Sequence, residues 1–216
     1  AGAAYVISGD DGSILHTFAG EASSDEFGGS VAGVGDVNND GYDDVAVGAW
    51  YVDINGQSLV GRTHVYSGVD GSVLHTFTGD APGESGGSAL AGAGDVNGDG
   101  CDDIVVGARN TISGDHFGSV RVRSGADGTL LYEFVGQREF GSFGRVLSGA
   151  GDVNGDGFDD ILVGRGSVEI DGENRTSAHI FSGVDGAELY VFHGDAEADN
   201  FAAAISHAGD LNGDGF

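Results

Sequence analysis

The sequence predicts an all-β protein, and more narrowly a β-propeller built of four-stranded antiparallel blades. Two short motifs recur with a period of 57–59 residues, short apolar runs rather than long amphipathic ones separate the glycines, and no segment of useful length has a helical period. The period is somewhat above that of familiar blades. A β-solenoid is the structural alternative, but solenoid coils are usually shorter and have fewer hairpin turns, so we favour the propeller.

The repeat is defined by two motifs. The first is Gly-Asp-(Val/Leu)-Asn, found at 35–38, 94–97, 151–154 and 209–212. The second is Ser-Gly-x-Asp-Gly, found at 8–12, 67–71, 124–128 and 182–186. Because both keep the same period, they are parts of one repeating unit.

Each repeat is predicted to contain four strands. In the first complete copy, a strand at 30–34 leads into an acidic loop and a strand at 44–48 leaves it. A third strand at 63–67 and a fourth at 73–77 flank an Asp-Gly turn. Asp-Gly between two apolar runs is a strong hairpin signal, because Gly accepts the positive φ that such turns require.

The chain is therefore expected to form one partial propeller domain over 1–216. We divide it into a half blade at 1–26, blades at 27–84, 85–142 and 143–200, and the start of a further blade at 201–216. Two interpretations stay open: a fragment of a longer propeller, or a four-bladed ring whose last blade is shared between the two ends of the chain.

The charge balance limits the classes of partner. The formal net charge is -27, from 35 acidic residues against 8 basic ones, all of them Arg. Such a chain should repel nucleic acid and anionic membranes. No stretch approaches the roughly 20 apolar residues of a membrane helix, so no membrane insertion is expected. The single Cys101 cannot form a disulfide within the chain.

The acidic loops have the composition of a calcium site. In the loop at 36–44, side-chain oxygens fall at positions 1, 3, 5 and 9, and the carbonyl at position 7 can also point inward. Gly41 at position 6 permits the sharp turn. Hard oxygen ligands suit Ca²⁺, whereas zinc would call for His or Cys side chains. The alternative is a set of Asx turns without metal.

The same ligand pattern recurs in each copy. The predicted Ca²⁺ ligands are Asp36, Asn38, Asp40, the Tyr42 carbonyl and Asp44; Asp95, Asn97, Asp99, the Cys101 carbonyl and Asp103; Asp152, Asn154, Asp156, the Phe158 carbonyl and Asp160; and Asp210, Asn212 and Asp214. An EF-hand is excluded because position 12 is a valine inside a β run instead of an acidic ligand. Only the backbone of position 7 is used, so Cys101 is expected to be a packing side chain.

The repeats resemble the FG-GAP repeats of integrin α-subunit propellers and their bacterial relatives. Phe27-Gly28 and Phe143-Gly144 stand before the first strand, and Gly48-Ala49 and Gly107-Ala108 follow the second, although the Pro of the family motif is absent. The resemblance implies a propeller, seven-bladed in integrins, with Ca²⁺ in the hairpin loops. We expect a bacterial secreted or cell-surface protein, and therefore an extracellular location.

A ligand is expected on the rim away from the metals. In antiparallel blades the acidic loops and the Asp-Gly turns share one rim, and the longer, more varied loops share the other: 49–61, 79–86, 108–117, 136–142 and 165–175. Variable loops on a regular scaffold are where binding normally resides. Trp50 and Tyr51 are the candidate ligand contacts, for a protein or glycan partner; the alternative is that they pack between blades.

No catalytic group is predicted. His16 and His75 share a fourth-strand position with Tyr132, which indicates a structural role. We expect a calcium-binding, non-catalytic module for extracellular ligand binding or cell adhesion. The alternatives are an ancillary or catalytic propeller domain of a secreted carbohydrate-active enzyme, and a structural module that binds only calcium. Exposed blade edges tend to pair, which adds self-association as a hypothesis.

Overall fold

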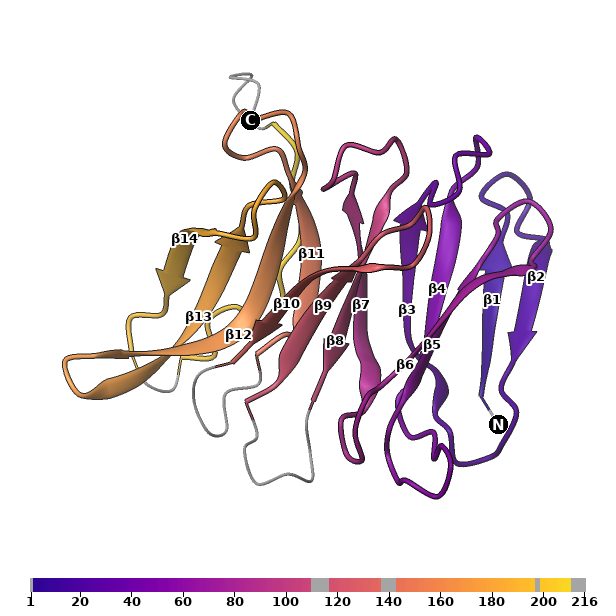
Figure 1. The fold of residues 1–216 in the computed structure, drawn as a ribbon, viewed down its shortest axis with the longest axis horizontal. Coiled ribbons are helices and arrows are strands. Elements are labelled where there is room, and N and C mark those ends of the chain that lie inside the picture. The colour runs from indigo at the N-terminus through magenta and orange to yellow at the C-terminus, as the bar shows by residue number, and fades with distance from the viewer. Residues whose placement is uncertain (1, 110–116, 137–142, 197–198, 211–216) are drawn as a thin grey trace.

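The structure is a computed structural model that describes residues 2–109, 117–136, 143–196 and 199–210. Within these ranges the chain forms three four-stranded antiparallel sheets and one two-stranded sheet, and it has no helix. The sheets stand side by side along the molecule in chain order (Figure 1). The prediction of an all-β protein with four-stranded antiparallel blades is confirmed.

Chain order and strand order agree in every sheet. The half-blade contains β1 (Ala3–Ile7) and β2 (Ile14–Ala19). Blade 1 contains β3 (Phe27–Gly35), β4 (Asp44–Ala49), β5 (Arg62–Tyr66) and β6 (Val73–Thr78). Blade 2 contains β7 (Gly86–Gly94), β8 (Asp103–Ala108), β9 (Ser119–Arg123) and β10 (Leu130–Val135). Blade 3 contains β11 (Val146–Gly151), β12 (Asp160–Ile170), β13 (Glu173–Phe181) and β14 (Glu188–His193).

The first strands of successive blades lie next to one another, β3 beside β7 and β7 beside β11. They border a hollow of about 430 Å³ lined by small and aliphatic residues, among them Ala32, Leu90 and Leu147. This close approach requires glycine, since a Cβ on Gly92 would lie 3.0 Å from the Val34 Cα. The Gly-rich first strands of the sequence therefore become the inner strands.

The core lies between the blades. Val34, Val37, Ala46 and Val65 of blade 1 pack against Ile104 and Val106 of blade 2, and a second cluster joins blades 2 and 3. Sheets covered on both faces need apolar residues on both sides of a strand, and β8 is buried along its whole length. This explains why the second strand of each repeat is a continuous apolar run instead of an alternating one.

One loop expectation was wrong. Most of 165–175, which we expected to be a variable loop, belongs to the long hairpin of β12 and β13 (Figure 1). Its turn is Asp171-Gly172, with φ of 55° and 82°. Positive φ at both central residues matches the hairpin turn that Asp-Gly favours, so the register continues outward instead of opening into a loop. Much of the loops 108–117 and 136–142 lies outside the described residues.

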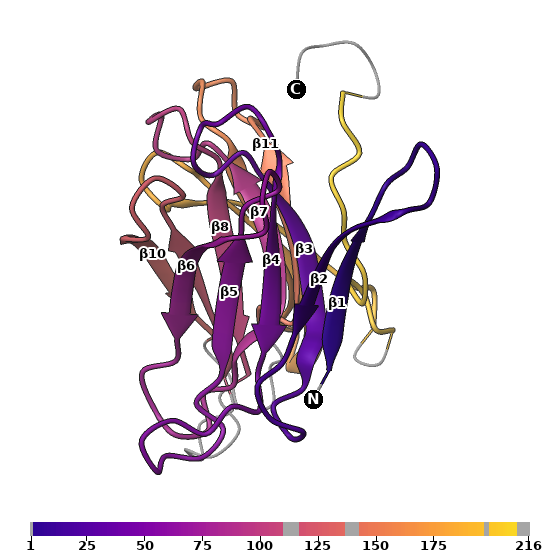
Figure 2. The ribbon, with the colours of Figure 1, turned by 90° about the vertical axis from the view of Figure 1, so that its right-hand side faces the viewer.

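The segment after blade 3 also differs from expectation. The described residues 199–210 contain no strand, although we expected a first strand there. They run on the inner side of the blades, as the yellow segment on the β3 side of blade 1 in Figure 2 shows. There, the His207 N–H donates to the Ser148 Oγ at 3.2 Å. Among the described residues, this segment therefore lies beside blade 3 without joining any of the sheets.

Candidate functional site

The acidic loop between β3 and β4 folds around its first aspartate. Asp36 Oδ1 accepts the Asp40 N–H at 3.0 Å, and Asp36 Oδ2 accepts the Gly41 N–H at 2.7 Å. Asn38 Oδ1 also accepts from Asp40 N at 3.0 Å, and Asp40 Oδ1 accepts from Tyr42 N at 3.0 Å. The turn needs glycine at position 6, where Gly41 has φ of 92°. The loop conformation is thus encoded by its own side chains.

The second loop (95–103) and the third (152–160) repeat these bonds. Asp95 accepts the N–H groups of Asp99 and Gly100 at 3.1 and 2.9 Å. Asp152 accepts those of Asp156 and Gly157 at 3.0 and 2.8 Å. Positions 1, 3 and 5 therefore occupy equivalent places in all three loops. In the fourth copy, Asp210 is the last described residue, and Asn212 and Asp214 lie outside the described residues.

The aspartates at position 9, Asp44, Asp103 and Asp160, are fully buried. Each one accepts two backbone N–H groups. Asp44 takes those of Val37 and Gly68 at 3.0 and 2.9 Å, and the other two repeat the pattern on Val96 with Gly125 and on Val153 with Gly183. This aspartate therefore ties the acidic loop to the Ser-Gly-x-Asp-Gly turn, and the structure places both motifs on one rim.

The same aspartates lie in a strongly negative environment. Burial raises the pKa of Asp44 and Asp160, and it raises the pKa of Asp103 to about 7. The carboxylates at positions 1 and 5 add to the increase in each loop, while the two N–H donors oppose it. A bound divalent cation would relieve this repulsion between the carboxylates of one loop.

The donor chemistry of the loops fits Ca²⁺, which takes carboxylate, amide and carbonyl oxygens. The carboxylates are near enough to perturb one another. Nevertheless, among the described residues no three His, Cys, Asp or Glu side chains converge closely enough to hold a metal. Cys101 is buried, and burial raises the pKa of its thiol, as expected for a packing side chain.

A role for position 8 was missed by sequence reasoning. The Asp36 N–H donates to Asp102 Oδ2 of the next loop at 2.8 Å, and the Asp95 N–H donates to Asp159 Oδ2 at 3.0 Å. A Cβ at Gly35 would lie 1.9 Å from Asp102 Oδ2, which explains the glycine that precedes each loop. In the sequence, the feature that could have indicated this role is the Asp-Asp doublet that ends every complete loop.

A second contact joins the outer strands of successive blades. His16 Nε2 donates to the Gly68 carbonyl at 2.9 Å, His75 Nε2 to the Gly125 carbonyl at 2.5 Å, and the Tyr132 hydroxyl to the Gly183 carbonyl at 2.7 Å. These side chains occupy the shared fourth-strand position. The geometry therefore gives them the structural role that the sequence indicated.

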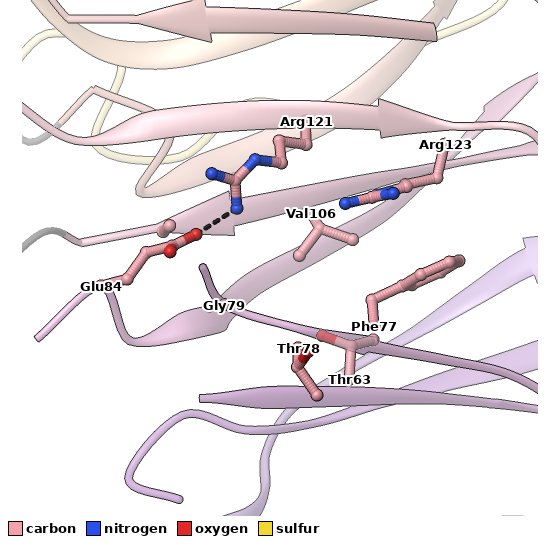
Figure 3. Close-up of a pocket in the computed structure, with 10 residues that line it drawn as sticks. Thr63, Phe77, Thr78, Gly79, Glu84, Val106, Arg121 and Arg123 are labelled. Carbon is pink, nitrogen blue, oxygen red and sulfur yellow. Dashed lines mark hydrogen bonds and ion pairs between the residues drawn. The ribbon is translucent and has the colours of Figure 1, made fainter. Parts of the chain in front are cut away.

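Blades 1 and 2 also meet around a charged cluster (Figure 3). Arg121 pairs with buried Glu84, with Asp80 at 3.1 Å and with Glu133 at 2.8 Å. Beside it is a cavity of about 10 Å³, which holds about one water molecule. The guanidinium is saturated by carboxylates of its own chain, so the cluster serves as a link between blades.

One nucleophile-like arrangement was not visible in the sequence. Ser177 Oγ lies 2.7 Å from His179 Nε2, and His179 Nδ1 lies 2.6 Å from Glu188 Oε1. Ser177 has no exposed surface, so a substrate could reach its hydroxyl only if the strand opened. The equivalent side chains, His64 and Arg121, also bond to fourth-strand partners, Thr76 and Glu133. We interpret the arrangement as a structural bond of the third strand.

The two candidate ligand contacts lie after β4. The Trp50 and Tyr51 rings have centroids 4.1 Å apart, and Tyr51 is 41% exposed. The Arg109 guanidinium of blade 2 lies 4.7 Å from the centre of the Trp50 ring. Trp50 is thus half-buried in packing between blades, while Tyr51 keeps a free surface. The structure adds Arg109 to the pair predicted from the sequence.

Comparisons with known proteins agree with the repeat and the fold. Residues 27–66 match the FG-GAP repeat, and residues 95–163 match the FG-GAP-like repeat. The chain is 30% identical to integrin alpha-5 of Xenopus laevis over 88% of its own length, and 38% identical to integrin alpha-7 of Mus musculus over 67%. It spans only 19% and 13% of those two proteins.

Solved structures of two rhamnogalacturonan lyases resemble the fold. The lyase YesW gives a TM-score of 0.53, and the Bacillus licheniformis enzyme gives 0.54. In each case the identity is 18%, and the likeness covers 85% of this chain and 38% of the other. At 18% identity, the likeness indicates a similar fold and nothing more. In the described part of the chain, no helix is long and apolar enough to cross a membrane.

Proposed function

Because the chain belongs to the FG-GAP repeat family, in its integrin α-like form, we propose that it is a calcium-binding, non-catalytic β-propeller module for extracellular ligand binding or cell adhesion. The observation that carries the proposal is the acidic loop, which recurs three times with the same internal hydrogen bonds on one rim. Each copy also buries an aspartate beside two further carboxylates, an arrangement that supports the proposal.

The residues proposed to hold the ion in each loop are the side chains at positions 1, 3, 5 and 9 and the carbonyl at position 7. A bound Ca²⁺ supplies positive charge to a loop that holds four carboxylates, three of them at the proposed ligand positions, and no basic residue. The chain itself contributes preorganisation, because Asp36, Asp95 and Asp152 already fix the turn through backbone N–H groups. Extracellular calcium modules bind at roughly 10⁻⁴–10⁻³ M, a range suited to an extracellular location.

Calorimetric titration with CaCl₂ and thermal melts in CaCl₂ and in EGTA test the proposal. A filled site at a hundredfold excess over its Kd stabilises the fold by about 2.7 kcal/mol, or roughly 5–10 °C in Tm for a chain of this size. Several filled sites should therefore give a large difference between the two buffers. Identical melts and no heat of binding would refute calcium binding.

Asp99→Asn separates a metal ligand from a turn residue. The substitution keeps an oxygen that can accept the Cys101 N–H, now at 3.0 Å, but it removes one charge from the second loop. We expect one fewer tightly bound Ca²⁺ per chain. The matched control is Asp127→Asn, in an exposed turn where the carboxylate bonds to Thr129 and Ser124 of the same turn; it should leave the stoichiometry unchanged.

The partner is proposed to bind the rim opposite the acidic loops. The exposed Tyr51 ring beside Trp50 and Arg109 can stack on a sugar ring or contact a protein. This cluster also favours the second candidate function, an ancillary or catalytic domain of a secreted carbohydrate-active enzyme.

Glycan-array binding by Tyr51→Ala tests the ligand rim. The control is Tyr42→Ala, which removes a tyrosine that is 63% exposed but lies in the first acidic loop, on the other rim. Only the Tyr42 carbonyl is proposed as a metal ligand, so calcium binding should survive this substitution. Loss of glycan binding in Tyr51→Ala alone supports the proposed rim. Equal loss in both variants contradicts it, and turnover of a bound polysaccharide would replace the non-catalytic proposal by the enzyme alternative.

A further inference from the structure

The aspartate at position 8 of the second loop holds the aspartate at position 1 of the first loop by two hydrogen bonds. The Asp36 N–H donates to Asp102 Oδ2 at 2.8 Å, and the Asp102 N–H donates back to the Asp36 carbonyl at 3.0 Å. The N–H and the carbonyl of Asp36 are therefore both bonded to one residue, which lies 66 positions further along the chain.

The same reciprocal pair of bonds joins the second loop to the third. The Asp95 N–H donates to Asp159 Oδ2 at 3.0 Å, and the Asp159 N–H donates to the Asp95 carbonyl at 3.4 Å. The residue before the second loop is Gly94, with φ of 74°, and a Cβ there would lie 2.0 Å from Asp159 Oδ2. Since this glycine leaves room for the carboxylate, the contact is a constant part of the loop at both junctions.

Asp36 is also the residue around which the first loop folds. Its carboxylate accepts the N–H groups of Asp40 and Gly41 at 3.0 and 2.7 Å, and it is the proposed ligand at position 1. The backbone that carries a side chain sets the direction in which that side chain can point. A residue that fixes the N–H and the carbonyl of Asp36 therefore also restrains the Asp36 carboxylate, and Asp102 can do this without itself binding the ion.

Such a restraint affects ion binding through conformational entropy. A loop that closes around an ion loses backbone freedom, and this loss opposes binding. A contact that already restrains position 1 removes part of the loss from the binding step, although it adds no ligand. An aspartate at position 8 should therefore increase the Ca²⁺ affinity of the loop before its own.

We infer that Asp102 is a positioning residue for the Ca²⁺ site of the first loop, and that Asp159 has the same role for the second loop. The inference rests on the calcium binding proposed above. Each of these two loops takes its ligands from one blade and the anchor of its first ligand from the next blade. The affinity of the loop is consequently set in part by a residue outside its own repeat.

Terbium luminescence reports on the first loop separately from the others. Tb³⁺ takes the same oxygen ligands as Ca²⁺, and it emits strongly when a tyrosine close to it is excited. Position 7 of the first loop is Tyr42. In the other copies it is Cys101, Phe158 or Phe216. The part of the emission that Tyr42→Phe removes therefore belongs to the first loop, and its displacement by CaCl₂ gives the Ca²⁺ affinity of that loop.

Three substitutions in the full chain separate positioning from charge. Asp102→Ala removes both the charge and the acceptor oxygen, and it should weaken Ca²⁺ binding at the first loop about tenfold. Asp102→Asn also removes the charge but keeps an acceptor for the Asp36 N–H, so it should bind about three- to tenfold more tightly than Asp102→Ala. Asp102→Glu keeps the charge but moves the carboxylate by one methylene, and it should also weaken binding.

The matched control is Asp159→Ala, which removes the same residue from the same loop position one blade further on. It should leave the affinity of the first loop within about twofold of the wild-type value. Circular dichroism checks that each variant is folded. If Asp102→Ala does not fold, the comparison of Asp102→Glu with the wild type carries the test, since an effect of charge alone would leave that variant unchanged.

The outcomes distinguish this inference from the proposed function. Equal affinities of Asp102→Asn and Asp102→Ala, or wild-type affinity in Asp102→Glu, would show that only charge acts and would overturn the inference. So would an Asp159→Ala variant whose first loop binds as weakly as that of Asp102→Ala. A wild-type chain that gives no heat of binding with CaCl₂ refutes the proposed calcium binding itself, and the inference with it.

Discussion

Replacing Asp102 with alanine tests whether an acidic loop holds the neighbouring blade. In the structure, Asp102 Oδ2 accepts the Asp36 N–H of the preceding loop at 2.8 Å. Hydrogen bonds to a charged group contribute about 1.5–3 kcal/mol. Asp102 is half-buried and water can reach the freed N–H, so we expect a loss in the lower half of that range, about 1.5–2 kcal/mol in the free energy of unfolding.

The first acidic loop contains a matched control. Asp43 is the same residue at the same loop position, but within the described residues its carboxylate bonds to no neighbouring loop. Asp43→Ala should therefore change the stability by no more than about 0.5 kcal/mol. Any effect that acts through the loop itself, or through a metal at the adjacent position 9, should be the same in both variants and cancels in the comparison.

Urea unfolding followed by circular dichroism, in saturating CaCl₂ and again in EGTA, gives the free energies. The slope with denaturant should stay unchanged, since neither substitution alters the surface exposed on unfolding. Asp102→Asn keeps an acceptor oxygen and should lose less than Asp102→Ala. If Asp43→Ala and Asp102→Ala prove equally destabilising, the contact between loops carries no stability and the reasoning is wrong.

Three further predictions concern single residues. Tyr132→Phe removes the 2.7 Å bond to the Gly183 carbonyl and should cost about 0.5–1.5 kcal/mol in denaturant unfolding. Tyr190, 49% exposed on β14, occupies the equivalent fourth-strand position, and Tyr190→Phe should leave the free energy of unfolding unchanged. Phe181→Ala empties the stack on Phe134 and should cost about 3–5 kcal/mol in the same assay; a smaller cost would show that the second core cluster can collapse. Hydrogen bonds from Thr129 lower the pKa of Asp127 in the folded state, so the stability that this carboxylate adds is present above about pH 4 and disappears as the pH falls further. The deficit of Asp127→Asn relative to the wild type should therefore shrink on acidification, and a deficit independent of pH would contradict this assignment.

Much of the fold could be predicted from the sequence because each element depends on residues that are close together in the chain. The two motifs fix the period, and Asp-Gly turns fix the hairpins. The strands at 44–48 and 73–77 were predicted within one residue of β4 and β6 at each end. The same local signals gave a wrong expectation at 165–175, where Asp171-Gly172 continues the β12–β13 hairpin. They did so again at 201–210, where a strand-like segment joins none of the sheets of the described chain. The calcium ligands remain a prediction from the loop composition.

By itself, the sequence determined what lies within one repeat: the strand type, the turns, the oxygen donors and the acidic loop that folds on its own first aspartate. Those features depend on contacts between residues close in the chain. Only the tertiary structure decided what lies between repeats. Asp102 bonds to a loop 66 residues away, Tyr132 bonds to a carbonyl 51 residues away, and Arg109 covers Trp50. These contacts depend on which blades are neighbours in space, and a single repeat cannot encode that.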